Sequence, residues 1–463
     1  MAKKKSGDYT SGPLFFPILM FSLPIMATGI LQIFYNMMDQ VVVGQFSGNP
    51  LALGAVGSTG SFYSLLANLA IGISVGAGVI VAHNFGARQS EGIARAVHTS
   101  FALSLIAGVL LGAVGFAVSR PMLVLMGTKA ELLELATLYI RIVFLGMPVT
   151  ILYNFGAAIL RSVGDSRTPL ILLSISGIIN VLLNLFFVIV CHMSVEGVAL
   201  ATVLSQVVSA VAVWVVIAKR EDAVRFRLKK TCLDRRMVRE ILRIGIPSGI
   251  QGSMFAISNM VLQSGVNTFD PYTVSGSTVG GTIEGFTYIT MNSFYQSALT
   301  FTGQNHGARR PDRVKRVLWY SLLQVSAAGV LVGFACILFS HPLSSLFVDT
   351  AMGGTELIVA AARERMNMIL SFYFLCGMME VLTGHLRGKG HSVVTMLVTV
   401  FCTCVFRVLW VSLIFSLPAF HTLTGLYICY PVSWLLNILA DMVVIAIIAR
   451  REKREAAPPP VKE

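Results

Sequence analysis

The run from Phe15 to Val43 restricts the possible folds more than any other feature of this chain. It is almost wholly apolar, and about 20 apolar residues are enough to cross a bilayer as a helix. Asp39 is its only formally charged residue, and Pro24 lies inside it. A carboxylate at membrane depth is costly, so by default it faces the protein interior or a water-filled cavity and has a function. We therefore expect a spanning helix that carries a functional acid and can bend at Pro24.

The rest of the sequence repeats this apolar pattern. Of the 463 residues, 55% are hydrophobic and only 12% are charged, whereas a soluble domain averages roughly 25% charged residues. We predict an all-α integral membrane protein with twelve transmembrane helices, which leaves no room for a soluble catalytic domain. The predicted helices cover residues 15–43, 51–82, 97–118, 136–160, 169–190, 195–218, 244–266, 276–302, 317–340, 366–386, 393–416 and 423–449.

The positive charge of the chain lies mainly in its loops. The net charge is +13, and the basic residues cluster in the amino tail, in alternate loops and in the carboxyl tail. Loops rich in Lys and Arg remain in the cytoplasm. The charge therefore predicts that both termini are cytoplasmic and that the partner is a lipid bilayer, and we expect no nucleic-acid partner.

An internal repeat divides the chain into two halves. Segments that share residues at matching positions lie 221, 226 and 223 residues apart, a nearly constant offset. Because six helices is an even number, both halves cross the membrane in the same sense. This parallel-repeat plan occurs in transporters, with the substrate site between the halves. The paired segments are 84–88 with 305–309, 160–166 with 386–392, and 23–40 with 246–263.

The repeat predicts two six-helix lobes around a central cavity. The expected organisation is a cytoplasmic basic tail at 1–13, an amino-terminal lobe at 14–218, a basic cytoplasmic linker at 219–243, a carboxyl-terminal lobe at 244–449 and a cytoplasmic tail at 450–463. The two halves differ in charge, since the counterpart of Asp39 is Leu262. We therefore expect the function of Asp39 to belong to one lobe only.

These motifs resemble those of the multidrug and toxic compound extrusion family of bacterial efflux transporters. The resemblance covers nearly the whole chain, and its specific motifs are Gly86-Ala87-Arg88, the paired Leu-Arg-x-x-Gly-x-Ser segments that begin at Leu160 and Leu386, and Glu284-Gly285-Phe286. It implies a multi-pass protein of the bacterial plasma membrane that exports small amphipathic or cationic drugs in exchange for protons or sodium ions. We expect a monomer without cofactors and without enzymatic activity.

The resemblance also implies a set of coupling residues around Asp39. In family members with a cation site in the amino-terminal lobe, the helix-1 aspartate works with polar residues of helices 4, 5 and 6. The matching positions here are Asn154, Asn180, Asn184 and Thr202. Many such members have an aspartate where this chain has Asn184, so the pocket would hold one formal negative charge rather than two. The identity of the coupling ion at Asp39, a proton or a sodium ion, therefore stays open.

The residues themselves agree with this chemistry. Asn180 and Asn184 are four residues apart and share one helix face. A carboxylate with amide and hydroxyl oxygens suits a small hard cation, and burial away from water favours the protonated form of a carboxylate. The alternative is that the amides and the hydroxyl only hold helices together, since such contacts are worth about 0.6 kcal/mol in membranes.

The second half carries buried charges of its own. Glu284, Glu380, Arg407 and Asp441 lie within apolar runs. A buried charge needs a partner, and we interpret Arg407 as the only basic residue near mid-membrane in this half, paired with one of the three acids. The pair either fixes helix packing or takes part in coupling, with Glu284 and Glu380 favoured over Asp441.

Two other functions compete with drug export. A lipid-linked oligosaccharide flippase of the same wider superfamily would favour a cationic cavity for pyrophosphate, and the interior of the first lobe is not basic. A membrane-embedded enzyme would need His, Asp or Cys clustered at one depth, which the sequence does not show. ATP-driven transport is disfavoured because no phosphate-binding GxxxxGK[ST] loop is present.

Overall fold

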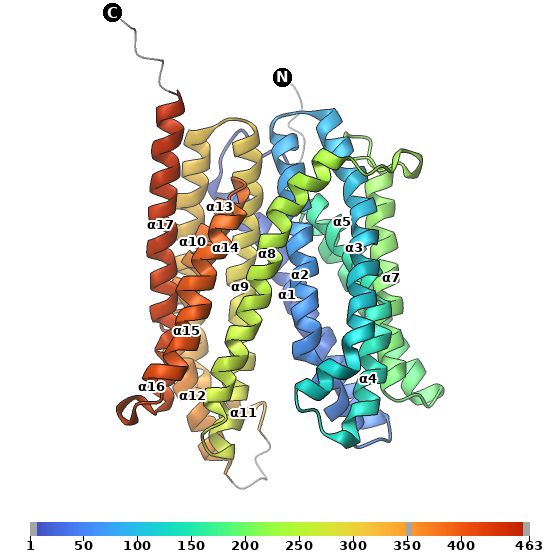
Figure 1. Cartoon of the computed structure of the whole chain (residues 1–463), viewed down its shortest axis with the longest axis vertical. Helices are drawn as coiled ribbons and strands as arrows, with labels where there is room; N and C mark the ends of the chain where they lie inside the picture. Colours follow the sequence, from blue (N-terminus) through green and yellow to red (C-terminus); the bar gives the residue numbers. More distant parts are fainter. Residues whose placement is uncertain (1–6, 349–353, 457–463) are drawn as a thin grey trace, which may run out of the picture. The chain divides into compact units, whose positions relative to one another are not determined.

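The computed structural model describes residues 7–348 and 354–456. Within these residues every regular element is a helix (Figure 1). Eight helices are long and apolar enough to cross a membrane, and two bent helix pairs bring this to ten. The two remaining predicted spans are also helical, but they are more polar: α8 (Arg235–Val266) starts with a charged turn and α9 (Pro271–Gly307) is rich in Ser, Thr and Gly. The predicted all-α membrane fold is confirmed.

Two of the predicted helices are broken near the middle. The segment predicted at 136–160 consists of α4 (Ala130–Leu145) and α5 (Met147–Ser162), bent by 47°, and the segment predicted at 366–386 consists of α12 (Thr355–Leu370) and α13 (Tyr373–Gly388), bent by 48°. In the first pair, Pro148 lies in the first turn of α5, where proline starts a helix but cannot continue one. Both breaks occur at matching places in the repeat.

The repeat extends to the backbone conformation. Arg88 and Arg309 have φ of 56° and 54°, and Gly164 and Gly390 have φ of 88° and 89°. A non-glycine residue with positive φ is uncommon, yet the two arginines each follow a helix at equivalent positions. The amide that follows each of them bonds a carbonyl five residues back, as in a Schellman helix end. Two identical helix ends at one offset support duplication of the chain.

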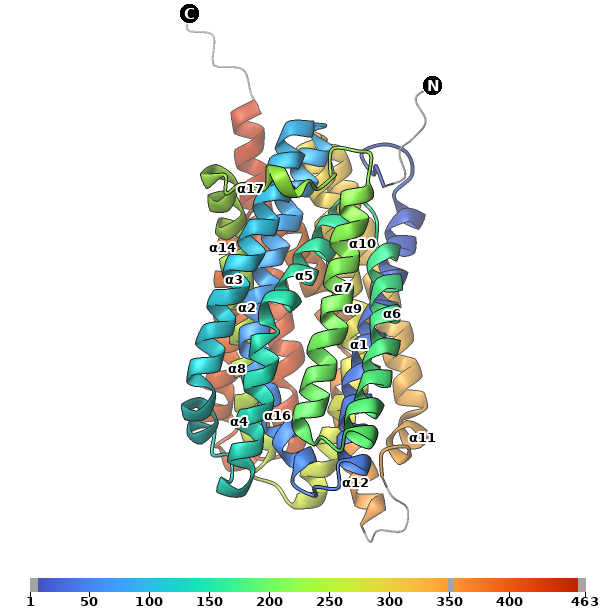
Figure 2. The same cartoon turned by 90° about the vertical axis from the view of Figure 1, so that its right-hand side faces the viewer.

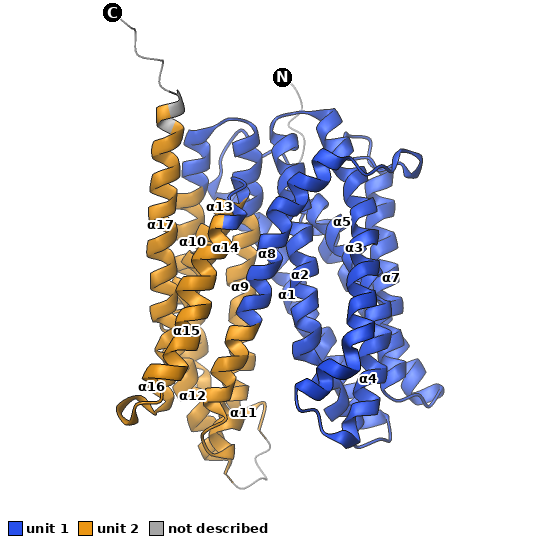
Figure 3. Ribbon diagram, viewed as in Figure 1, with its two compact units in different colours: residues 1–256, 299–317, 388–393 blue, residues 257–298, 318–387, 394–463 orange. Residues whose placement is uncertain are grey.

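The chain forms two compact units, which we describe separately (Figure 3). Unit 1 comprises residues 1–256, 299–317 and 388–393, and unit 2 comprises residues 257–298, 318–387 and 394–463. These units reflect packing, so the division predicted from the repeat remains a prediction. One boundary is corrected: α8 begins at Arg235, inside the predicted linker, because the Asp234 carboxylate accepts the amides of Arg236 and Met237 and caps the helix.

Unit 1 is built on helices of the first half of the chain. In this unit α5 packs against α2, α3 and α7, and α6 packs against α1 and α7 (Figure 2). Besides α4 and α5, its elements are α1 (Phe15–Phe46), α2 (Ala52–Gly86), α3 (Ser90–Leu125), α6 (Arg167–Leu185), the π-helical turn η1 (Phe186–Val190), α7 (Val195–Lys219) and the 3₁₀ turn η2 (Leu228–Lys230).

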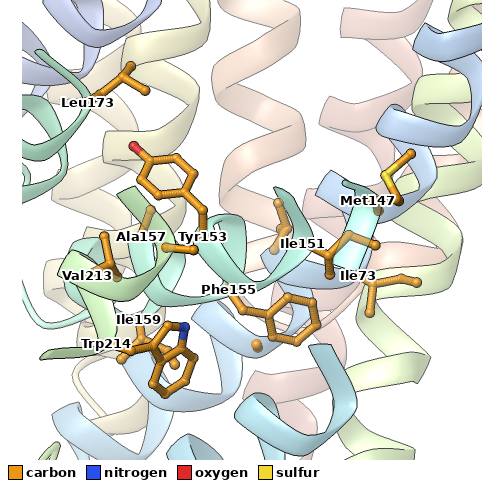
Figure 4. Packing of buried hydrophobic residues seen from close by; sticks show 14 of the residues in the cluster. Ile73, Met147, Ile151, Tyr153, Phe155, Ala157, Ile159, Leu173, Val213 and Trp214 are labelled. Carbon is orange, nitrogen blue, oxygen red and sulfur yellow. The ribbon is translucent and has the colours of Figure 1, made fainter. Parts of the chain in front are cut away.

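The core of unit 1 lies around α5 (Figure 4). Ile151, Phe155 and Ile159, spaced by four residues, are fully buried there, as expected for one face of a helix. The indole of Trp214 on α7 donates a hydrogen bond to the Leu152 carbonyl at 2.9 Å. A Cβ at Gly156 would lie 2.2 Å from Val213 Cγ1, so glycine permits the close approach of α5 and α7.

The amino-terminal segment 7–12 packs onto unit 1 before α1 begins. The ring of Tyr9 stacks on Phe301 with centroids 3.9 Å apart. The buried side chain of Gln304 accepts the Tyr9 amide at 3.0 Å and donates to the carbonyls of Gly7 and Ser162 at 3.1 and 2.9 Å. Burial, with the nearby Asp165 carboxylate, raises the pKa of the Tyr9 phenol above its usual value. This segment is therefore anchored to the helices rather than loosely attached.

Unit 2 contains helices of the second half. Parts of α8, α9, α13, α10 (Pro311–Leu338) and α14 (Ser392–Thr399) belong to unit 2 and parts to unit 1. The other described elements, besides α12, are α11 (Ser340–Ser345), the π-helical turns η3 (Val400–Val405) and η4 (Trp410–Ile414), α15 (Phe406–Leu409), the 3₁₀ turn η5 (Pro418–Phe420), α16 (Leu423–Tyr427) and α17 (Cys429–Ala456).

Candidate cation-coupling site

Three helices of unit 1 bring polar side chains to one buried place. Asp39 lies near the end of α1, Asn180 and Asn184 lie on α6, and Thr202 lies on α7. The helices contact one another in all three pairs. Asp39 is only 8% exposed and Asn184 is fully buried. The site is thus an interhelical polar cluster shielded from the surroundings.

Hydrogen bonds link these four side chains directly. The Asn184 amide donates to Asp39 Oδ1 at 2.5 Å and lies 3.3 Å from Asn180 Oδ1. The Thr202 hydroxyl lies 3.2 Å from Asp39 Oδ2 and 3.0 Å from the Val198 carbonyl. Because the hydroxyl has one hydrogen, it donates to one of these acceptors at a time. Both carboxylate oxygens of Asp39 therefore have a donor within reach.

One acceptor at this site has no hydrogen-bond partner. Asn184 Oδ1 is buried, and no described donor reaches it. A buried carbonyl oxygen without a partner is costly. A hydrogen-bond donor or a small cation beside it would satisfy this oxygen. The cluster offers carboxylate, amide and hydroxyl oxygens, which are the ligands that hard cations prefer.

The local backbone changes directly after this cluster. Asn184 precedes the π-helical turn η1, and η4 lies at the matching place in the second half. Single π-helical turns inside helices frequently occur at functional sites. A π-helical turn changes the direction in which the following side chains point. The residues after η1 therefore do not continue the helix face that carries Asn180 and Asn184.

The predicted coupling role of Asn154 remains a prediction. Its amide donates to the Thr150 carbonyl at 2.9 Å, one turn earlier on α5, and the Thr150 hydroxyl in turn bonds Gln206 Oε1. The structure thus places Asn154 in hydrogen bonds of its own helix.

Pro24 lies within α1, which runs without interruption from Phe15 to Phe46. The Thr28 hydroxyl donates to the Pro24 carbonyl at 2.7 Å. Proline removes one helical hydrogen bond and so provides a natural position for a bend. The predicted bend of helix 1 at this residue remains a prediction.

The predicted charges of unit 2 divide into separate contacts. Glu284 on α9 forms a salt bridge of 2.8 Å with Arg365 on α12, whose guanidinium also bonds Ser277 Oγ and lies over the Tyr427 ring. The prediction that Arg407 is the only basic residue near mid-membrane in this half remains a prediction. The sequence analysis overlooked Arg365 as a buried basic residue inside a helix of this half. The error arose because the predicted helix began at 366, whereas α12 begins at Thr355, so that Arg365 was assigned to a loop.

The remaining charges lie on other helices of unit 2. Arg407 is buried, donates to Ser433 Oγ at 3.0 Å and to Asn259 Oδ1 at 3.3 Å, and lies over the Tyr430 ring. Glu380 on α13 accepts the Tyr288 hydroxyl at 3.2 Å. Asp441 on α17 is fully buried. A coupling role for these residues remains a prediction.

These features define a class: a duplicated, all-helical, multi-pass membrane protein with a buried acid among amides and a hydroxyl. The MatE family model matches residues 24–186 and 247–413. The two matched blocks begin at Pro24 and Pro247, which are equivalent positions of the repeat. The chain belongs to the MatE family, as its motifs predicted.

The relatives and solved structures agree with this assignment. The chain is 26% identical over 436 residues to the probable multidrug resistance protein YoeA of Bacillus subtilis, covering 91% of each chain. It is 25% identical to the probable multidrug resistance protein NorM of Thermotoga maritima, covering 82% of each. A crystal structure of MATE in complex with MaL6 superposes with a TM-score of 0.87 at 25% identity, covering 97% of this chain and 98% of that one.

Proposed function

We propose that this protein is a secondary active multidrug exporter in which a proton or a sodium ion binds at Asp39. Its membership of the MatE family and the names of its multidrug resistance relatives support the transport of drugs. The observation that carries the coupling mechanism is the buried carboxylate of Asp39, surrounded by Asn180, Asn184 and Thr202. The substrates are amphipathic or cationic drugs, and the protein acts as a monomer in the bacterial plasma membrane.

The coupling follows from the chemistry of the cluster. With a cation bound, the charge of Asp39 is neutralised and the orphaned Asn184 oxygen gains a partner. Without the cation, the carboxylate depends on the Asn184 amide and the Thr202 hydroxyl. A ligand shifts a two-state equilibrium only by its differential affinity for the two states. The cation therefore biases α1, with Pro24 as its bend, between two conformations that face opposite sides of the membrane.

The fold by itself does not define the substrate. A solved structure with a TM-score of 0.84 and 23% identity is described as a MOP superfamily transporter whose reversed pocket polarity suggests a different function. The test must therefore follow drug movement directly. Ethidium efflux from vesicles that contain the protein, with proton and sodium gradients imposed separately, distinguishes the two coupling ions.

The first prediction is that Asp39→Asn abolishes gradient-driven efflux while the protein folds normally. Asparagine keeps the shape of the side chain but cannot carry a proton or a negative charge. Asp222→Asn is the matched control, because it makes the same chemical change in a loop where Asp222 pairs with Arg220 at 2.9 Å. Efflux at the wild-type rate in Asp39→Asn would contradict the proposal, as would loss of efflux in the control alone.

A further inference from the structure

A second buried carboxylate, in unit 2, lacks the donors that Asp39 has. Asp441 on α17 is fully buried, and both of its carboxylate oxygens have no hydrogen-bond partner among the described residues. One turn earlier on the same helix, Asn437 is also fully buried. Its amide donates to the Thr399 hydroxyl at 3.3 Å, and its Oδ1 has no partner.

The unpartnered atoms of Asn437 and Asp441 are all acceptors. Asn437 and Asp441 are four residues apart and so lie on the same face of α17, against which the π-helical turn η3 packs. An ionised carboxylate here would lack every donor that water supplies, whereas a protonated carboxyl becomes a donor itself. A metal ion fits less well, because hard cations take about six oxygen ligands and the two side chains supply three.

The titratable groups that face Asp441 are the Arg387 guanidinium on α13, which also faces Glu380, and the Cys402 thiol on η3. Glu380 has a donor, the Tyr288 hydroxyl. Asp441 has no donor among the described residues, and burial without a donor favours the protonated form of a carboxyl group.

We propose that Asp441 is a second proton-binding site of this protein, with Asn437 Oδ1 as the acceptor for the bound proton. This site is independent of Asp39, which lies in unit 1 and is held by Asn184 and Thr202. Proton binding at Asp441 does not depend on the proposed export activity. Only the use of that proton in transport rests on the proposed function.

Infrared difference spectroscopy of the full-length protein at neutral pH tests the proposal. A protonated carboxyl has a carbonyl stretch that ionised carboxylates lack. We expect Asp441→Asn to remove one such band, Asn437→Ala to shift it by removing its hydrogen-bond acceptor, and Asp441→Glu to restore it. Asp222→Asn, a loop carboxylate paired with Arg220, is the matched control and leaves the band unchanged.

The outcomes separate this site from the one at Asp39. A spectrum of Asp441→Asn identical to that of the wild type overturns the proposal. If that variant does not fold, an unshifted band in Asn437→Ala overturns it instead. Asp39→Asn must retain the Asp441 band.

If proton gradients drive no efflux at all but the band is present, the export mechanism fails while the proton site stands. If they do drive efflux, Asp441→Asn shifts its pH profile.

Discussion

At the scale of single residues, Asp39 and Asn184 set the charge of the cluster at which we propose that a cation binds. The cluster holds one acid, and the closest side chain to it donates an amide hydrogen at 2.5 Å. That donor stabilises an ionised Asp39 without any metal ion. A second carboxylate in the same position would repel the first unless a cation or a proton lay between them. With Asn at position 184, the cluster therefore needs a bound metal ion less than a pair of carboxylates would.

This leads to the prediction that Asn184→Asp introduces or strengthens sodium binding. The substitution removes the amide donor and places a second acid beside Asp39, so sodium neutralises a charge that the wild type does not have. Sodium at about 100 times its dissociation constant would stabilise the folded variant by about 2.7 kcal/mol. Thermal unfolding in sodium and in choline chloride measures this gain. Asn267→Asp is the matched control, because Asn267 only accepts an exposed hydrogen bond from Gln263. An equal response of the two variants would contradict the prediction.

The sequence identified some residues of the site and missed others for physical reasons. The position of Asp39 in the protein interior could be predicted, because a lone charge in an apolar run is costly when it faces lipid. Arg365 could not be assigned in this way, because the start of α12 was placed too late. Contacts between helices that are distant in sequence leave no periodic signal, so the pairing of Glu284 with Arg365 required the structure.

At the scale of elements, the segment before α1 behaves as part of the helical packing. Gln304 on α9 is fully buried and makes three hydrogen bonds, to Gly7, Tyr9 and Ser162. The sequence predicted only a basic tail here, because a short polar segment before a helix looks the same whether it is anchored or free. The segment is held by side chains that lie about 300 residues further along the chain, since Asn305 and Arg313 also donate hydrogen bonds to the Tyr9 carbonyl.

We predict that Gln304→Ala destabilises the protein by about 1–3 kcal/mol, the usual cost of leaving buried hydrogen-bonding groups unpaired. The Tyr9 amide and the Ser162 carbonyl would both lose their partner. Thermal unfolding gives the stability, and hydrogen exchange of residues 7–12 shows whether the segment detaches. Gln263→Ala is the control, because Gln263 makes one exposed bond to Asn267. Protection of residues 7–12 that stays at the wild-type level would disprove the anchoring role of Gln304.

At the scale of the whole molecule, duplication preserved the backbone and changed the chemistry. Asp39 and its counterpart Leu262 are both buried, at 8% and 2% exposure, so burial at this position does not require a charge. The helix ends at Arg88 and Arg309 and the two bent helix pairs are shared. The sequence could predict this plan because the motifs recur at a constant offset. The sequence could not show that Gly164 and Gly390 share one backbone conformation but contact different residues.

That difference permits a matched test on equivalent residues. Gly164 and Gly390 have nearly the same φ, 88° and 89°, so alanine brings the same backbone strain at both, about 1–2 kcal/mol. At Gly164 the new Cβ would lie 2.4 Å from Gly7 Cα, whereas at Gly390 the nearest atom, His83 Cε1, is 3.9 Å away. We predict that both variants lose stability, that Gly164→Ala loses more, and that only Gly164→Ala exposes residues 7–12 to hydrogen exchange. Thermal unfolding and exchange of both variants measure this. Equal stability loss with equal exchange would show that the segment can move aside without cost, and that the strain of the left-handed turn alone maintains glycine at both positions.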